Sequence, residues 1–173
     1  ASNNTGIGYA ALNANTTGGN NNAVGANALD ANTTGGYNNA VGQNALGANT
    51  EGNYNVAMGQ DALANNTTAS NNVGIGRSAL VANTTGYQNT AVGALALDAN
   101  TEGFENTAVG YNCLSDVTTG DHNTAIGHDA LENVSTGSYN NALGRDAGRN
   151  ITTGSSNICI GQNAADADNH IGV

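Results

Sequence analysis

This sequence of 173 residues contains no Pro and no Trp, and only 4% of its residues are aromatic and 9% charged. A globular domain of this length usually builds its core from large apolar side chains, which are scarce here. Most of the apolar residues are Ala, Val, Leu or Ile. Such a composition excludes a conventional thick core, so we expect burial to come from repetition of a thin one.

Lys is also absent, and three Arg against 13 Asp or Glu give a formal net charge of −10. Nucleic acids and anionic membranes select basic surfaces, so we expect neither as a partner. No apolar run approaches the roughly 18 residues of a membrane span, so no membrane insertion is expected. The chain begins at Ala1 in the middle of a sequence pattern. We therefore expect it to be a mature or excised piece of a longer protein.

The sequence does contain a repeat with a period of 17 residues, and residues 38–52 show the part of the unit that recurs most closely. A fixed short period without insertions is typical of a solenoid, whereas low-complexity disorder has no reason to keep register. A strand-plus-helix unit is disfavoured, because 17 residues leave too little chain for both and their connections. We predict one all-β domain over residues 1–173, a parallel β-solenoid (β-roll) of ten turns with two short strands each. The turns are centred on Gly8, Gly25, Gly42, Gly59, Gly76, Gly93, Gly110, Gly127, Gly144 and Gly161.

Two apolar positions recur in each unit and are predicted to face the core. The residue before the central glycine is a sizeable apolar one, and in most units a Leu follows four residues after that glycine. Strand alternation would place the first of these on the inner side of its strand. The predicted core ladder includes Val24, Val41, Val92, Val109, Ile126, Leu29, Leu46 and Leu97.

An Asn recurs four residues before the central glycine. Its amide can both donate and accept a hydrogen bond, so copies on successive turns can satisfy one another or the adjacent backbone. We predict a structural role for this ladder in preference to a ligand-binding one. Its members include Asn21, Asn38, Asn55, Asn72, Asn89, Asn106, Asn123 and Asn140.

A small residue recurs two positions before the central glycine, on the strand side opposite the predicted core. Two explanations are open: it faces a narrow corner of its own coil, or it faces another chain around a symmetry axis. A thin core gains from oligomerisation, which favours the second explanation and a homotrimer. The candidate inter-chain residues are Ala23, Ala40, Ala57, Ala91, Ala108 and Ala125.

The motif Asn-x-Ala-Val/Ile-Gly-x-x-Ala, as in residues 38–45 and 123–130, carries a resemblance. It is similar to repeats in the heads of YadA-like trimeric autotransporter adhesins. The full unit, continuing into Asn-Thr-Thr-Gly, resembles the 17-residue repeat shafts of phage tail-fibre-like and bacterial surface proteins. The resemblance covers essentially the whole chain and implies a left-handed, trimeric β-roll in an extracellular, cell-surface or virion location.

Two further ladders suggest alternative functions. The corner Thr that includes Thr33, Thr50 and Thr84 could form an ice-binding plane, although Glu51 and Glu102 interrupt the neighbouring position. Aromatic residues that share a phase on successive turns could bind a surface glycan or a receptor, or could simply stack on each other. The candidate ligand surface consists of Tyr37, Tyr54, Tyr87 and Phe104.

No recurring position carries catalytic chemistry, so we expect no enzyme activity, catalytic residue, metal or cofactor. His122, His128 and His170 differ in phase, and Asp30, Asp98, Glu132 and Asp166 share one without lying on neighbouring turns. Cys113 and Cys159 are about three turns apart, too far for a disulfide. We therefore expect a structural rod, shaft or head segment of an extracellular or virion fibre, adhesive or able to form end-to-end filaments.

Overall fold

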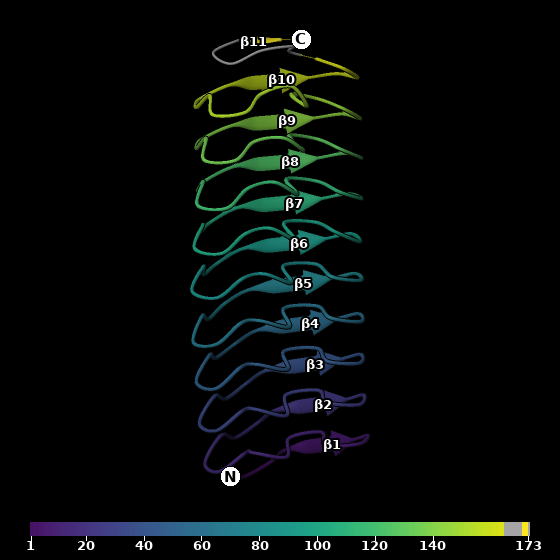
Figure 1. The fold of residues 1–173 in the computed structure, drawn as a ribbon, viewed down its shortest axis with the longest axis vertical. Helices are drawn as coiled ribbons and strands as arrows, with labels where there is room; N and C mark the ends of the chain where they lie inside the picture. Colours follow the sequence, from purple (N-terminus) through teal and green to yellow (C-terminus); the bar gives the residue numbers. More distant parts are fainter. Residues whose placement is uncertain (165–170, 173) are drawn as a thin grey trace.

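The computed structural model describes residues 1–164 and 171–172, which form a parallel β-solenoid (Figure 1). Eleven strands form one sheet in sequence order, and every neighbouring pair is parallel. No helix occurs in the described residues. The strands are β1 (Thr5–Ile7), β2 (Asn22–Val24), β3 (Asn39–Val41), β4 (Val56–Met58), β5 (Val73–Ile75), β6 (Thr90–Val92), β7 (Thr107–Val109), β8 (Thr124–Ile126), β9 (Asn141–Leu143), β10 (Ile158–Ile160) and β11 (Ile171–Gly172).

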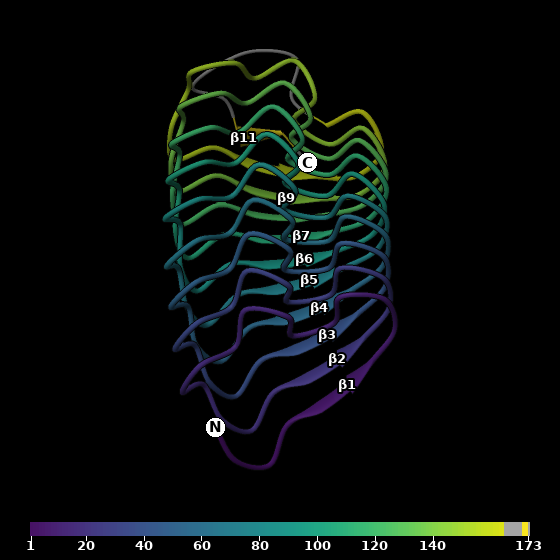
Figure 2. The ribbon, with the colours of Figure 1, turned by 60° about the horizontal axis from the view of Figure 1, so that its bottom comes forward.

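The strands β1 to β10 keep the 17-residue period of the sequence, so each residue lies beside its own copy. In β2 and β3, for example, Ala23 pairs with Ala40 and Val24 with Val41. Seen from 60° away, the strands lie along one flank of the coil and the connecting segments form the other walls (Figure 2). We number the turns one to ten by the strands β1 to β10 that they contain.

The side of each strand that faces the core is the opposite of the one predicted from the sequence. The middle residue of each strand points inward, and Ala23, Ala40, Ala57, Ala91, Ala108 and Ala125 are completely buried. The residue before the central glycine points outward, with Val24, Val41 and Ile126 exposed by 37%, 42% and 42%. Val92 and Val109 are half-buried. The prediction that Val24, Val41, Val92, Val109 and Ile126 face the core is therefore wrong.

The Leu half of the predicted core ladder explains this orientation. Leu29, Leu46 and Leu97 are fully buried, and their side chains extend across the coil to the underside of the strands. At Gly74, in the middle of β5, an added Cβ would lie 3.2 Å from Cγ of Leu63. A methyl group is about the largest side chain that fits there, so the larger Val must face outward.

The segment that carries the Leu ladder is not the second strand that we predicted. Its backbone alternates between negative and positive φ, with positive values at Asn27 (57°) and Leu29 (51°) and at the same positions of later turns. A left-handed conformation costs a Leu roughly 1–2 kcal/mol. Full burial of the side chain contributes about 1.5–3 kcal/mol, which offsets that cost.

The central glycine is required by the distance between turns. At Gly42, φ is 139°, a value that L side chains rarely adopt. An added Cβ would also overlap the carbonyl oxygen of Gly59 on the next turn. The same overlap recurs along most of the solenoid, which explains why a glycine returns every 17 residues.

The orientation of the strands can be tested with two substitutions in one turn. Leu46→Ala should lower the free energy of unfolding by about 2–5 kcal/mol, because it leaves a cavity in the core. Val41→Ala should lower it by less than about 1 kcal/mol, because Val41 lies outside the coil. Urea unfolding followed by circular dichroism measures both. A larger loss for Val41→Ala would mean that the Val ladder faces the core.

Candidate functional site

The Asn ladder before the strands is a continuous internal network. Asn21, Asn38, Asn55 and their copies up to Asn140 have no exposed surface. The backbone N–H of Asn38 donates to Oδ1 of Asn21 (2.9 Å), and Nδ2 of Asn38 donates to the carbonyl oxygen of Gly52 (2.8 Å). The side-chain amide of Asn38 thus accepts from the backbone N–H of Asn55 on the following turn and donates to the corner that leads there, so its donor and acceptor are both used within the chain.

A second buried Asn ladder lies at the corner, where the sequence indicated only a turn. Nδ2 of Asn49 donates to Oδ1 of Asn32 (2.8 Å) and to the carbonyl oxygen of Gly52 (3.1 Å). The signal was present in the recurring Asn of Asn-Thr-Thr-Gly, but local turn chemistry explained it equally well. The members are Asn15, Asn32, Asn49, Asn66, Asn83 and Asn100.

This corner ladder ends with an unpaired acceptor. Beyond Asn100 the position is taken by Val117, Val134 and Ile151, all fully buried. Val117 has no N–H in its side chain, so nothing donates to Oδ1 of Asn100, which is buried without a hydrogen-bond partner. One orphan acceptor is the unavoidable result of changing from a polar to an apolar ladder in this direction.

The first Asn ladder should be essential for stability. Asn72→Ala leaves the backbone N–H of Asn89 without its acceptor and removes one of the two hydrogen bonds to the carbonyl oxygen of Gly86, which keeps the one from Asn83. Because an unsatisfied buried group costs about 1–3 kcal/mol, we expect a loss of at least about 1 kcal/mol in the free energy of unfolding, measured by thermal or urea unfolding. The matched control is Asn141→Ala, at an exposed strand position. Equal effects of the two substitutions would contradict the structural role.

The corner Thr ladder is also used within the chain. Oγ1 of Thr33 donates to the carbonyl oxygen of Thr50 at 3.0 Å, and Oγ1 of Thr84 donates to that of Thr101 at 3.0 Å. The hydroxyl protons are thus committed to the neighbouring turn. This geometry favours a structural role for these Thr and weighs against their use as an ice-binding plane.

The predicted aromatic pairs are stacked along the solenoid. The ring centroids are 4.9 Å apart for Tyr37 and Tyr54, and 5.0 Å apart for Tyr87 and Phe104, with nearly parallel planes. Two residues that the sequence analysis missed extend the second pair: His122 lies edge-on to Phe104 and stacks on Tyr139 at 4.7 Å. Both share the phase of Tyr37, which was the available signal.

Stacking between turns reduces the ring surface that could bind a glycan. A sugar binds an aromatic residue against its free ring face, but each ring of a stacked pair covers one face of its neighbour. Tyr37 and Tyr54 therefore can offer at most one ring face each. The arrangement favours stacking as the main role of these residues, as in cross-strand pairs of sheets.

The structure brings together three potential metal ligands that the sequence analysis did not connect. One ligand atom from each of His128, Asp129 and Asp146 lies within 4.8 Å of the others. Arg149, however, pairs with Asp129 (3.6 Å) and Asp146 (3.3 Å), and Arg145 pairs with Asp146 (3.0 Å). Because guanidinium groups already neutralise both carboxylates, the cluster is an ion-pair network of the solenoid wall. His170 and Asp166 lie outside the described residues.

Cys113 and Cys159 are both free thiols, and both are buried in the core. Sγ of Cys113 lies 3.3 Å from the carbonyl oxygen of Ala125, to which it can donate. Burial raises the pKa of the Cys113 thiol to about 12. The pKa of Cys159 is also raised by burial.

Cysteine reactivity should therefore report folding. With a pKa of about 12, only about one Cys113 in ten thousand is a thiolate at pH 8, and the thiolate is the reactive form. We expect native protein to react negligibly with a thiol reagent such as Ellman's reagent at pH 8, and both thiols to react in denaturant. Rapid reaction of native protein would show that these positions open to solvent.

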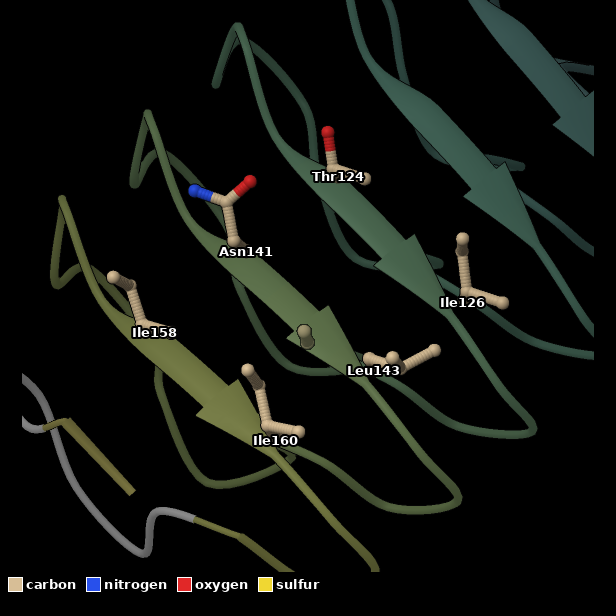
Figure 3. Close-up of a pocket in the computed structure, with 7 residues that line it drawn as sticks. Thr124, Ile126, Asn141, Leu143, Ile158 and Ile160 are labelled. Carbon is tan, nitrogen blue, oxygen red and sulfur yellow. The ribbon is translucent and has the colours of Figure 1, made fainter. Parts of the chain in front are cut away.

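The outer side of the strands is the remaining unassigned surface. The first and third residues of β1 to β10 point outward in two parallel ladders, one mainly Thr, Asn and Val and the other Val, Ile, Leu and Met. Figure 3 shows this side at β8 to β10, where Ile126, Leu143, Ile158 and Ile160 surround an open hollow of about 220 Å³. We call this surface the strand face.

The candidate inter-chain residues are not part of that surface. Ala23, Ala40, Ala57, Ala91, Ala108 and Ala125 are completely buried within their own coil, so they cannot contact another chain. Of the two explanations that the sequence left open, the narrow corner inside the coil is the correct one. The homotrimer consequently loses the contact on which the prediction was based.

No protein-family model, curated protein or solved structure matches this chain. None of the described residues belongs to a helix long and apolar enough to cross a membrane. The fold itself defines the class, a parallel β-solenoid of tandem 17-residue repeats.

Proposed function

We propose that this chain is a rigid structural rod, a shaft or head segment of an extracellular or virion fibre with adhesive or filament-forming capacity. The observation that carries the proposal is that the sheet and the first Asn ladder join every turn from one to ten to the next. A non-enzymatic role is part of the same proposal.

The ladders supply resistance to bending and shear. In the central turns, each turn is bonded to its neighbour by a strand, by two buried Asn amides and by a Thr hydroxyl. To slide or tilt one turn, several buried hydrogen bonds must break together, and a buried polar group without a partner is costly. A stiff element is what a shaft requires.

The side chains that could act as acids, bases or metal ligands make contacts within the solenoid. Nε2 of His122 lies 3.1 Å from a carboxylate oxygen of Glu105, and the acidic group around Asp146 is neutralised by Arg145 and Arg149. A structural role accounts for each of these contacts. The resemblance of the repeat to adhesin heads and fibre shafts supports the extracellular or virion location.

The proposal predicts the shape and behaviour of the particle. Ten turns at about 4.8 Å each make a rod roughly 48 Å long. Small-angle X-ray scattering and negative-stain images should show rods of this length, or strings of them joined end to end. Leu46→Ala is the destabilised control, and it should lose the rod shape at a lower temperature. A flexible or globular particle would contradict the proposed function.

A further inference from the structure

The strand face of β1 to β10 carries no charged residue, although the chain has 16 of them. The ladder formed by the third residue of each strand consists of large apolar side chains, with Val41, Met58 and Ile126 exposed by 42–43%. The two ladders are Thr5, Asn22, Asn39, Val56, Val73, Thr90, Thr107, Thr124, Asn141 and Ile158, and Ile7, Val24, Val41, Met58, Ile75, Val92, Val109, Ile126, Leu143 and Ile160.

An exposed apolar surface of this length marks an interaction site on a soluble protein. The chain's net charge of −10 makes its other surfaces repel a second copy at short range. The strand face is where two copies can approach without bringing charges together. We propose that a second copy of this chain packs on the strand face, face to face, with the two rods antiparallel.

The antiparallel orientation follows first from the two ladders. A twofold axis parallel to the strands reverses the rod and sets the apolar ladder of one copy against the apolar ladder of the other. A twofold axis parallel to the rod would instead set the apolar ladder against the ladder that contains Thr90, Thr107 and Thr124. Hydroxyl and amide groups would then be buried against Val and Ile without partners, at a cost in free energy.

The distribution of charge along the rod favours the same orientation. Residues 1–86 contain three acidic residues and one Arg, whereas residues 87–173 contain ten acidic residues and two Arg. Parallel rods would place the two acidic halves side by side. Antiparallel rods place each acidic half beside the nearly neutral half of its partner, which lowers the repulsion.

The borders of the strand face have the composition of an interface rim. The residue two positions after each strand is Tyr9, Ala26, Gln43, Gln60, Arg77, Ala94, Tyr111, His128, Arg145 or Gln162. Tyr and Arg are enriched in protein interfaces, and a polar border around an apolar centre is their usual arrangement. These residues would line one edge of the contact, beside the two apolar ladders.

The area is sufficient for a reversible pair. Ten strands at about 4.8 Å, each roughly 10 Å wide, give about 480 Å² per copy, or nearly 1,000 Å² in total before the rim is added. That value is at the lower limit for a specific interface. We therefore expect an association that depends on concentration. In this pair turn ten of one copy meets turn one of the other, so the hollow beside Ile160 faces Ile7, which is 60% exposed.

The same face could in principle bind ice, but its composition favours a protein partner. An ice lattice selects one side chain repeated at a constant spacing. The apolar ladder instead varies among Val, Ile, Met and Leu, and Thr occupies the other ladder on only three consecutive turns. A second copy accommodates such variation, because each turn meets a different turn of its partner.

The first test measures mass in solution by light scattering over a range of concentrations. We expect a shift from one chain to two, and Val41→Asp should abolish the pair, because the twofold axis buries the new charge twice. The control Thr34→Asp adds the same charge at an exposed corner and should leave the pair intact. Circular dichroism of Val41→Asp checks that the monomer is still folded.

The second test fixes the orientation by disulfide cross-linking. In a background with Cys113→Ala and Cys159→Ala, one chain carries Val41→Cys in turn three and another carries Ile126→Cys in turn eight. Antiparallel rods place these two positions opposite each other, so the disulfide should form in the mixture and not with either chain alone. Cross-linking of Val41→Cys chains to chains that carry Asn39→Cys in the same turn would indicate parallel rods and overturn the proposal.

Other outcomes would also overturn it. These are a single chain at every concentration, a mass of three chains, or thermal hysteresis of a monomer that Val41→Asp abolishes, which would assign the strand face to ice. The proposal deepens the structural role by naming the partner, but the two can fail separately. Stable rods that remain single would remove the pair and leave the proposed rod function standing.

Discussion

The stacking of each turn on its own copy, at the spacing of neighbouring β-strands, is the constraint on which the rest of this structure depends. At that spacing only glycine fits where the chain leaves the strand, because any Cβ at Gly42 would overlap the next turn. The same spacing brings identical Asn amides within hydrogen-bonding distance, so a polar residue can fill the core at every level. Glycine and Asn thus replace the large apolar residues that the composition lacks.

Every position stacks on its own copies in the neighbouring turns. A change of residue type therefore costs stability only between the two turns where the types differ. The replacement of the corner Asn by Val117 leaves a single orphan acceptor on Asn100, while the turns on either side remain satisfied. Ring stacking has the same local character: Tyr37 and Tyr54 form a pair without requiring a ring on the next turn. The solenoid can therefore vary its ladders without losing its coil.

The thin core also determines what the solenoid shows to its surroundings. Leu63 and its copies fill the coil, which leaves space under most strands for nothing larger than Ala. The exception is Cys159 in β10, which lies beside Gly148, where the Leu ladder has ended. The larger Val, Ile, Met and Leu side chains of the strands are consequently displaced to the outside, where they form a continuous apolar surface. A regular protein with few charged residues thus carries its most apolar strand ladder on the exterior.

The sequence by itself determined the period, the parallel stacking, the inward Leu ladder and the recurring Asn, because each of these follows from residue type and spacing alone. Which side of a three-residue strand faces inward could not be predicted, since alternation permits either, and the space left by Leu46 and its copies decides it. The single strand per turn, the second Asn ladder and the contacts of His122 were likewise decided by the tertiary structure. They depend on left-handed backbone conformations and on distances between turns, which a periodic pattern does not contain.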